Sequence, residues 1–180
     1  MKVVFDEIYD QYHQDLYQFI FYMVKDKQIT EDLVQEVYLK VLKSSERFRG
    51  DSSIKTWLFS IARHVSLDHF RRKKRTRDRI ADYFDWGEKS HIIKDEHPLP
   101  EEMAIKSEEI KNLYTYLDFC TVDQKSVLIL RYIQSFSIQE TATILNFTIS
   151  KVKTTQHRGL KLLKKLIIEE QEKGGGSNGF

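Results

Sequence analysis

Residues 137–159 read SIQETATILNFTISKVKTTQHRG, and the spacing within this stretch decides the fold of the C-terminal half of the chain. Ala142 has a side chain small enough for two helices to touch. Asn146, four residues later, tolerates the left-handed backbone that a tight turn needs. Val152 can then pack back onto the first helix, and Thr148 can cap the second. This spacing is typical of a helix-turn-helix, whose second helix enters the major groove of DNA.

The second helix of this motif has two different faces when its residues are placed at about 100° each. The inward face is largely apolar and consists of Val152, Thr155, Gly159, Leu162, Leu163 and Leu166. We expect Gly159 to contact the first helix of the motif. The outward face is polar and consists of Ser150, Lys151, Lys153, Thr154, His157, Arg158, Lys161 and Lys165.

The order of residues along the outward face favours DNA recognition. Short hydrogen-bonding side chains are found near its N-terminal end, and basic side chains continue further along the helix. Contacts to the edges of DNA bases near the helix start, and to phosphates later, would demand that order. The alternative is a Lys-rich amphipathic helix that its charges only keep soluble. A face with one sign of charge is unusual for such a helix.

The N-terminal half is also helical in its apolar period, and no stretch alternates as a strand would. A first inward stripe consists of Phe5, Ile8, Tyr9, Tyr12, Leu16, Phe19, Ile20 and Met23. A second consists of Leu33, Val34, Val37, Tyr38, Val41 and Leu42, and a third of Ile54, Trp57, Leu58, Ile61, Ala62 and Val65. Thr30 is expected to be the N-cap of the second helix, and residues 50–53 are expected to form a turn and a cap before the third.

The C-terminal half begins with a predicted helix that carries Ile110, Leu113, Tyr114 and Leu117. Thr121 with Gln124, and Ser137 with Glu140, match capping boxes that fix two further helix starts. We therefore expect an all-α protein with two small helical domains, residues 1–75 and 104–170. An acidic linker, residues 76–103, joins them, and a disordered Gly-rich tail, residues 171–180, follows.

Charge is distributed unevenly along the 180 residues, although the formal net charge is only +2. Residues 61–80 hold eight Lys or Arg against two acids, and residues 141–168 hold six against none. Between them, residues 82–102 hold seven acids against two lysines. Two basic blocks on either side of an acidic stretch indicate two contact surfaces for a polyanion.

Several classes of function are disfavoured. Cys120 is the one cysteine, and the six histidines lack metal-ligand spacing, so neither a disulfide nor a metal site is expected. No glycine-rich phosphate loop, GxSxG or Cys–His pair is present, which predicts no cofactor and no enzymatic activity. The longest apolar run, residues 19–24, is too short to span a bilayer, and the N-terminus lacks the layout of a signal peptide. A cytoplasmic protein is expected.

The motifs of the N-terminal half resemble region two of bacterial sigma factors. Asp32-Leu33-Val34-Gln35-Glu36-Val37 is similar to the acidic polymerase-binding helix of that region. Its promoter-melting segment is resembled by three successive stretches: Phe48-Arg49-Gly50, Trp57-Leu58-Phe59-Ser60-Ile61-Ala62-Arg63, and Asp68 with Arg71-Arg72.

The motifs of the C-terminal half resemble region four: Leu130-Arg131-Tyr132, the stretch 137–142 and the stretch 152–159. The resemblance covers residues 4–75 and 104–168. Regions one and three are absent, which indicates the extracytoplasmic-function (ECF) group of the sigma-70 family. Within that group, the sequences of the motifs are most similar to the sigma-X type of Gram-positive bacteria.

The resemblance implies a protein that binds core RNA polymerase and directs promoter-specific initiation, in a cell-envelope or stress response. Its implied partners are core polymerase, promoter DNA and a membrane-anchored anti-sigma factor, with no small-molecule substrate. Polymerase binding is assigned to Asp32, Gln35 and Glu36. Recognition and melting of the minus-ten element is assigned to Arg49, Asp51, Ser52, Lys55, Ser60, Arg63, His64 and Arg71, of which Lys55, Ser60, Arg63, His64 and Arg71 are expected to be exposed. Recognition of the minus-thirty-five element is assigned to Ser150, Lys151, Lys153, Thr154, His157, Arg158 and Lys161.

Two other functions are left open by the residues. One is a stand-alone helix-turn-helix regulator with an N-terminal sensing domain, which would normally be a dimer on paired half-sites. A measurement of the protein's size in solution would separate this regulator from a sigma factor, because the sigma hypothesis predicts a monomer. The other is a helical adaptor in which both basic blocks are incidental, and the salt dependence of promoter binding discriminates that case.

Overall fold

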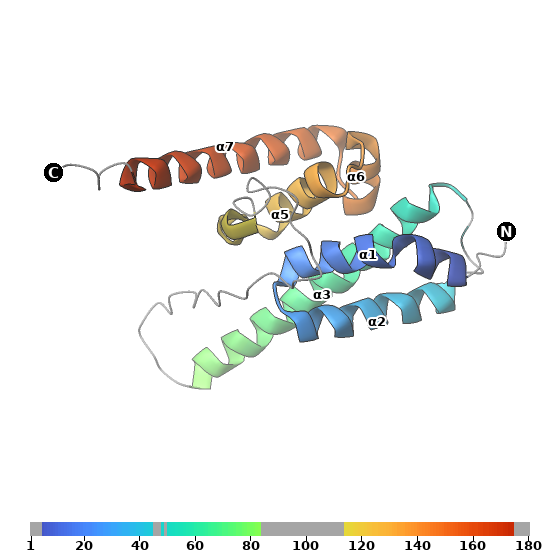
Figure 1. Cartoon of the computed structure of the whole chain (residues 1–180). Coiled ribbons are helices and arrows are strands. Elements are labelled where there is room, and N and C mark those ends of the chain that lie inside the picture. The colour runs from blue at the N-terminus through green and yellow to red at the C-terminus, as the bar shows by residue number, and fades with distance from the viewer. Residues whose placement is uncertain (1–4, 45–47, 49, 84–113, 175–180) are drawn as a thin grey trace. The chain divides into compact units, whose positions relative to one another are not determined.

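The computed structural model describes residues 5–44, 48, 50–83 and 114–174, and all regular structure within these ranges is helical (Figure 1). The expected all-α fold class is confirmed. The chain divides into two compact units, Met1–Met103 and Ala104–Phe180. No helix among the described residues is long and apolar enough to cross a membrane.

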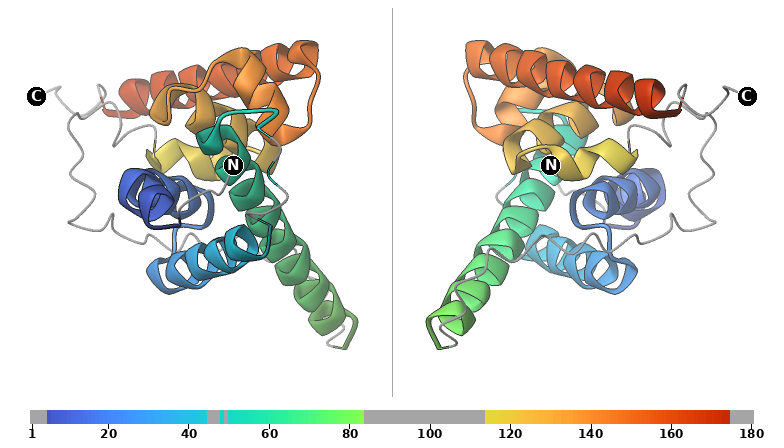
Figure 2. Two further views of the ribbon diagram at one scale, coloured as in Figure 1. Left: turned by 90° about the vertical axis from the view of Figure 1, so that its right-hand side faces the viewer. Right: turned by 90° about the vertical axis from the view of Figure 1, so that its left-hand side faces the viewer.

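The N-terminal unit packs three helices together: α1 (Phe5–Val24), α2 (Lys27–Ser44) and α3 (Ile54–Tyr83) (Figure 2). Its core includes residues of all three predicted stripes, with Leu16, Phe19 and Leu58 fully buried. Phe59, which the predicted stripes do not include, is fully buried as well. The ring centroids of Phe19 and Phe59 lie 5.4 Å apart and join α1 to α3.

Asp26, rather than Thr30, caps α2. The Asp26 Oδ1 accepts a 2.8 Å hydrogen bond from the backbone N–H of Ile29. Thr30 is buried inside the first turn, and its hydroxyl donates to the Asp26 carbonyl at 2.6 Å. The helix therefore begins one turn earlier than predicted, because a carboxylate next to the left-handed Lys25 (φ 55°) satisfies a free N–H of that turn.

Two residues expected to face inward are exposed: Tyr9 by 42% and Leu42 by 53%. Each follows a buried residue, Ile8 or Val41, that occupies the inward position of its turn. Tyr9 and Leu42 lie about 100° further around their helices. Tyr9 therefore sits at the edge of the packed face, with its ring centroid 5.4 Å from that of Tyr38, and Leu42 faces outward. Trp57, also expected inward, is half-buried, with its ring 5.0 Å from that of Phe48.

The turn before α3 has the expected form. Gly50 adopts φ 78°, and the Ser53 hydroxyl oxygen accepts a 3.1 Å hydrogen bond from the backbone N–H of Thr56. At its other end, α3 continues past Arg75 to Tyr83, into the segment expected to be a linker. Lys and Arg are good helix formers, and residues 71–83 contain no Gly or Pro, so the helix continues although residues 71–79 are all exposed. Residues 84–103 lie outside the described residues.

The C-terminal unit contains a short 3₁₀ turn (Leu117–Phe119), α5 (Val122–Leu128), a π-helical turn (Ile129–Ile133), α6 (Ile138–Leu145) and α7 (Ile149–Gly174). Tyr114 and Leu117 of the predicted first helix are buried, while Ile110 and Leu113 lie outside the described residues. Helix α7 packs on both α5 and α6.

Both predicted capping boxes are confirmed. The Thr121 and Ser137 hydroxyl oxygens accept from the backbone N–H groups of Gln124 and Glu140, at 3.2 and 3.1 Å. The side chains of Gln124 and Glu140 accept in return from the N–H groups of Thr121 and Ser137, at 3.0 and 2.8 Å. Local hydrogen bonds within four residues fix both helix starts, which is why the sequence alone reveals them.

Candidate nucleic-acid interface

The turn between α6 and α7 has the geometry that the sequence predicts. Asn146 adopts a left-handed backbone (φ 53°, ψ 47°), and the N–H of Phe147 donates to the Ala142 carbonyl at 2.9 Å. The Thr148 hydroxyl oxygen accepts from the N–H of Lys151 at 3.1 Å and caps α7. Val152 is fully buried. The two helices therefore form the expected helix-turn-helix.

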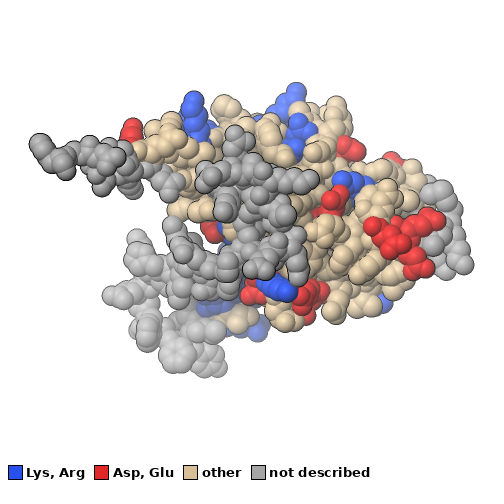
Figure 3. Space-filling view, viewed as in Figure 1, with Lys and Arg blue, Asp and Glu red and all other residues tan. Residues whose placement is uncertain are grey.

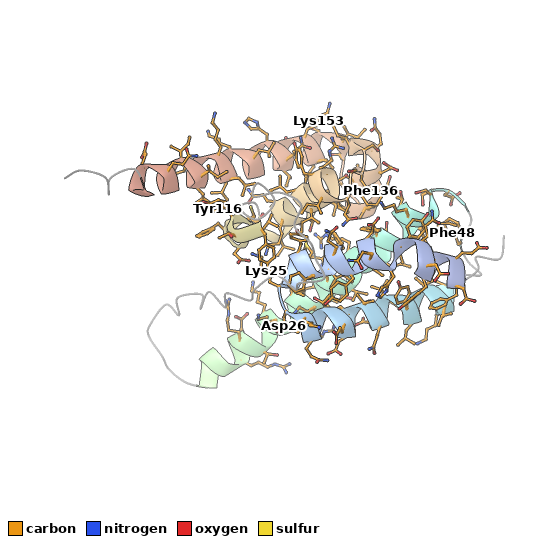
Figure 4. All side chains as sticks on the ribbon, in the orientation of Figure 1. Lys25, Asp26, Phe48, Tyr116, Phe136 and Lys153 are labelled. Atoms are coloured by element: carbon orange, nitrogen blue, oxygen red, sulfur yellow. The ribbon has the colours of Figure 1, made fainter. Side chains whose placement is uncertain are left out.

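The outward face of α7 is as polar and as exposed as predicted. All eight residues assigned to it are exposed: Ser150, Lys151, Lys153, Thr154, His157, Arg158, Lys161 and Lys165. On the inward face Val152, Gly159 and Leu163 are buried, and Thr155, Leu162 and Leu166 are half-buried. Figure 3 shows Lys and Arg side chains along α7, and Figure 4 places Lys153 on its side away from α6. One side of the helix is thus free to approach a polyanion.

Gly159 contacts α5 and not the first helix of the motif. A Cβ added at this position would lie 3.0 Å from Leu128 Cδ1 and 3.6 Å from Gln124 Cβ. Helix α6 has only eight residues and meets the start of α7, so the middle of α7 packs on α5. The prediction of an inward glycine is confirmed, and its predicted partner is wrong.

A hydrogen-bonded chain that the sequence did not reveal joins α7 to the π-helical turn. Arg131 Nε donates to Gln156 Oε1 at 3.2 Å, and Gln156 Nε2 donates to the Tyr132 hydroxyl oxygen at 3.0 Å. A second Arg131 nitrogen donates to the Phe136 carbonyl. These bonds resist rotation of α7 about its own axis. In the sequence, only the Leu130-Arg131-Tyr132 motif points to two of these residues, Arg131 and Tyr132.

Lys151 is held by two groups at the start of α7. Its Nζ lies 3.6 Å from an Asp123 carboxylate oxygen and 3.4 Å from the centroid of the Phe147 ring. Asp123 belongs to the first turn of α5, and Phe147 belongs to the turn before α7. Neither was singled out in the sequence, because only the fold brings α5 beside the start of α7.

The basic end of α3 is exposed on every side. All nine residues from Arg71 to Arg79 are exposed, including seven Lys or Arg. Arg71 lies 3.5 Å from Asp68, and Arg72 lies 3.5 Å from Glu36 of α2. The other basic residues of this stretch are Lys73, Lys74, Arg75, Arg77 and Arg79.

The residues assigned to the minus-ten element differ in exposure, and two that were expected to be exposed, Lys55 and Ser60, are half-buried. Asp51 and His64 are exposed, and Ser52 is half-buried. Lys55 is half-buried, with its Nζ 2.9 Å from the Asp15 carboxylate. The half-buried Ser60 donates its hydroxyl to the Thr56 carbonyl at 2.9 Å. Arg49 lies outside the described residues.

Arg63 was expected to be exposed and is buried, with 3% of its surface accessible. Phe59 and Ser66, one turn before and after it, are buried as well. Position 63 therefore belongs to the inward face of α3, and the prediction of an exposed Arg63 is wrong. A charged residue type favours the surface, but helical periodicity overrides that preference here.

The polar face of α2 carries the three residues assigned to polymerase binding. Asp32 and Gln35 are exposed, and Glu36 is half-buried, 3.4 Å from Lys40 and 3.5 Å from Arg72. Leu33, Val34 and Val37 are buried, as predicted. Leu39 and Leu42, which are 56% and 53% exposed, continue the polar face at helical spacing.

Two histidines of the N-terminal unit have shifted pKa values. Burial lowers the pKa of His13, whose Nδ1 lies 3.1 Å from the Tyr38 hydroxyl oxygen. Burial also lowers the pKa of His69, as do the nearby Lys73 and Arg72, against the opposing effect of Asp26 and Glu36. Burial and the neighbouring Tyr9 raise the pKa of Tyr38 well above its usual range. Across the described ranges, no cluster of His, Cys, Asp and Glu could hold a metal ion.

Comparisons with known proteins cover both units. Residues 8–76 match the family model described as Sigma-70 region 2, and residues 121–163 match Sigma-70, region 4. The chain is 57% identical over 173 residues to the ECF RNA polymerase sigma factor SigX of Bacillus subtilis (strain 168), covering 94% of this chain and 88% of that protein. It is 30% identical to SigW of the same organism, covering 91% of this chain and 88% of that one.

The fold is similar to solved structures as well. One is the sigma factor RpoE in complex with the anti-sigma factor NepR from Bartonella quintana, with a TM-score of 0.68, 25% identity, and 91% of this chain and 96% of that chain covered. Another is CnrH in complex with the cytosolic domain of CnrY, with a TM-score of 0.64, 18% identity, and 92% and 88% covered. The second likeness concerns the fold alone.

Proposed function

The chain belongs to the sigma-70 family of RNA polymerase sigma factors, in its extracytoplasmic-function group, and we propose that its two units divide promoter recognition between them. The chain binds core RNA polymerase and directs it to promoters. In the proposal, the N-terminal unit contacts polymerase and the minus-ten element, and α7 of the C-terminal unit contacts the minus-thirty-five element. The observation that carries the proposal is the outward face of α7, where eight exposed polar or basic residues follow a capped helix start.

Contacts along α7 differ by position. Ser150, Lys151, Lys153 and Thr154 lie in the first two turns, where an inserted helix meets base edges. His157, Arg158 and Lys161 follow in the next turns, where side chains of an inserted helix meet phosphates on either side of the groove. Because phosphate contacts release counterions, binding through this face falls steeply with added salt.

Polymerase binding is assigned to the exposed face of α2. Asp32, Gln35 and Glu36 supply carbonyl and carboxylate oxygens, and the exposed Leu39 and Leu42 lie beside them. An apolar patch with an acidic rim fits a partner surface with an apolar centre and basic residues around it. This face would dock the N-terminal unit onto core polymerase.

Strand opening is assigned to the loop before α3 and to one side of that helix. Asp51 and Ser52 offer hydrogen-bonding groups to an unstacked base, and His64 and Arg71 are exposed on the helix that follows. Lys55, Ser60 and Arg49 are also kept from the predicted set, and Arg63 is left out because its side chain is buried. Opening would draw its energy from binding and isomerisation of the holoenzyme, with no nucleotide hydrolysis or other covalent chemistry by this chain.

The cellular setting is inferred from the family. We place the protein in the cytoplasm, in a cell-envelope or stress response, under a membrane-anchored anti-sigma factor. Support comes from the solved sigma factor of Bartonella quintana, which is bound to an anti-sigma factor and matches 91% of this chain. A stand-alone regulator with a sensing domain is not favoured, because the N-terminal unit matches sigma region 2.

Run-off transcription with purified core polymerase tests the proposal. Core polymerase with the full chain should yield a discrete transcript from a promoter selected by that holoenzyme, and core polymerase alone should not. A chain that binds the same DNA as a dimer without core polymerase, and adds no transcript, would establish the regulator alternative.

A further inference from the structure

Lys151 is the one assigned DNA-contacting residue on α7 for which the structure gives both an acidic and an aromatic partner. Its ammonium group lies 3.6 Å from Asp123 and 3.4 Å from the centre of the Phe147 ring. The three residues come from the first turn of α5, the inter-helix turn and the first turn of α7. A free lysine side chain samples many rotamers, and two attractive partners on different elements restrict it to few.

The carboxylate also decides what Lys151 can bind. A lysine that contacts a phosphate benefits from its full positive charge, and a carboxylate beside it repels the phosphate. A neutral base edge is not repelled in this way and needs only a donor in a fixed place. The ammonium has three N–H donors, and its ion pair with Asp123 leaves donors for a base. Half of the Lys151 side chain, 51%, stays exposed.

We propose that Asp123 and Phe147 are positioning residues that hold Lys151 against an acceptor-bearing base edge of the minus-thirty-five element. The proposal rests on the proposed role of α7. Guanine presents two major-groove acceptors, O6 and N7, to a lysine, and is the base that this arrangement favours. Specificity at that base pair then depends on α5, a helix outside the helix-turn-helix.

The test uses holoenzyme made from the full chain and core polymerase, with promoters selected from a library randomised in the upstream element. The variants are Asp123→Asn, which removes the charge at constant size, Phe147→Leu, Lys151→Ala and the double variant Asp123→Asn/Lys151→Ala. Asp118→Asn is the matched control, because Asp118 pairs with Lys125 at 3.4 Å on the same unit and is 45% exposed against 43% for Asp123. Thermal unfolding confirms that each variant folds.

The expected result is a loss of preference at one shared position. Asp123→Asn and Phe147→Leu should each weaken selection of guanine there by about two- to fivefold, as exposed ion pairs and cation–π contacts do. Lys151→Ala should weaken it further, and the double variant should match Lys151→Ala. Asp123→Asn should also bind all sequences slightly more tightly at low salt, because it removes a negative charge near the DNA. Asp118→Asn should select as the unaltered chain does.

Two results would overturn the proposal in different ways. If Asp123→Asn selects unchanged sequences while Lys151→Ala broadens one position, Lys151 acts without help and the positioning role is wrong. If Lys151→Ala and Lys161→Ala both leave selection and affinity unchanged, the role proposed for α7 fails, and the positioning role fails with it.

Discussion

Helices α3 and α7 both carry a run of basic residues, but they present it in different ways. On α7 the bases lie on one face, and the opposite face is packed on α5 and α6. At the end of α3, residues 71–79 are exposed all round, with basic side chains on every side. A packed helix has a fixed rotation relative to its unit, so its outer face can hold side chains in register with base edges. A helix end without packing has no such preferred face.

The difference separates two kinds of DNA binding. Side chains in fixed positions recognise bases, whereas charge spread around a helix attracts phosphates without regard to sequence. We therefore expect α7 to supply sequence preference and the end of α3 to supply affinity that is equal for all sequences.

Gly159→Ile should destabilise the C-terminal unit by about 2–3 kcal/mol. The first added atom would lie 3.0 Å from Leu128 Cδ1, so α7 must shift away from α5 to accommodate the side chain. Chemical denaturation followed by circular dichroism measures the loss. Thr76→Ile, in the exposed end of α3, is the matched control and should change stability by less than about 0.5 kcal/mol. An equal loss of stability from Gly159→Ile and Thr76→Ile would contradict the claim that α7 is packed and the end of α3 is not.

Reversing two charges on α2, with Asp32→Lys and Glu36→Lys together, should weaken binding to core polymerase by about tenfold or more. The acidic rim beside Leu39 and Leu42 would become basic, and helicity should remain. Competition for core polymerase against the unaltered chain measures the effect. Asp10→Lys, an exposed reversal on α1, is the control and should compete normally. A double reversal that also competes normally would remove α2 from the polymerase interface.

Neutralising the end of α3, with Arg75→Ala or Arg77→Ala, should lower affinity for all promoters about equally. Each lost phosphate contact should reduce the slope of log affinity against log salt by about 0.9. Salt titrations of holoenzyme on two unrelated promoter sequences measure both quantities. A change in affinity confined to one of the two sequences would show that this helix end recognises bases.

Stability of the N-terminal unit should fall as pH is lowered. Burial places the pKa of His13 in the folded chain below its ordinary 6.5, so the unfolded chain takes up the proton first. The contribution of the neutral His13 to the free energy of unfolding is fully present above pH 6.5, and it is lost progressively as the pH falls below 6.5. Denaturation at about pH 7.5 and about pH 5.5 should show a smaller pH effect for His13→Gln than for His64→Gln, which alters an exposed residue. Equal pH effects in both variants would exclude His13 as the cause.

Local features of this fold could be predicted from the sequence, and features that depend on packing between helices could not. The two capping boxes, the left-handed Asn146 and the Thr148 cap involve residues within four positions of one another, so the pattern contains all the information. The burial of Arg63, the contact of Gly159 with α5 and the pairing of Lys151 with Asp123 depend on which helices meet. The continuation of α3 to Tyr83 was missed because amphipathic periodicity marks only helices that have an apolar face to bury.

The central claim is that the packed helix α7 recognises sequence through its first turns and binds phosphates farther along. Promoter selection from a randomised upstream element, with matched salt titrations, tests it most directly in holoenzymes carrying Thr154→Ala or Lys161→Ala. Thr154→Ala should cost about 1–3 kcal/mol and relax preference at particular positions. Lys161→Ala should select the same sequences as the unaltered chain, with a salt slope reduced by about one. Identical selected sequences for Thr154→Ala and the unaltered chain would contradict the claim.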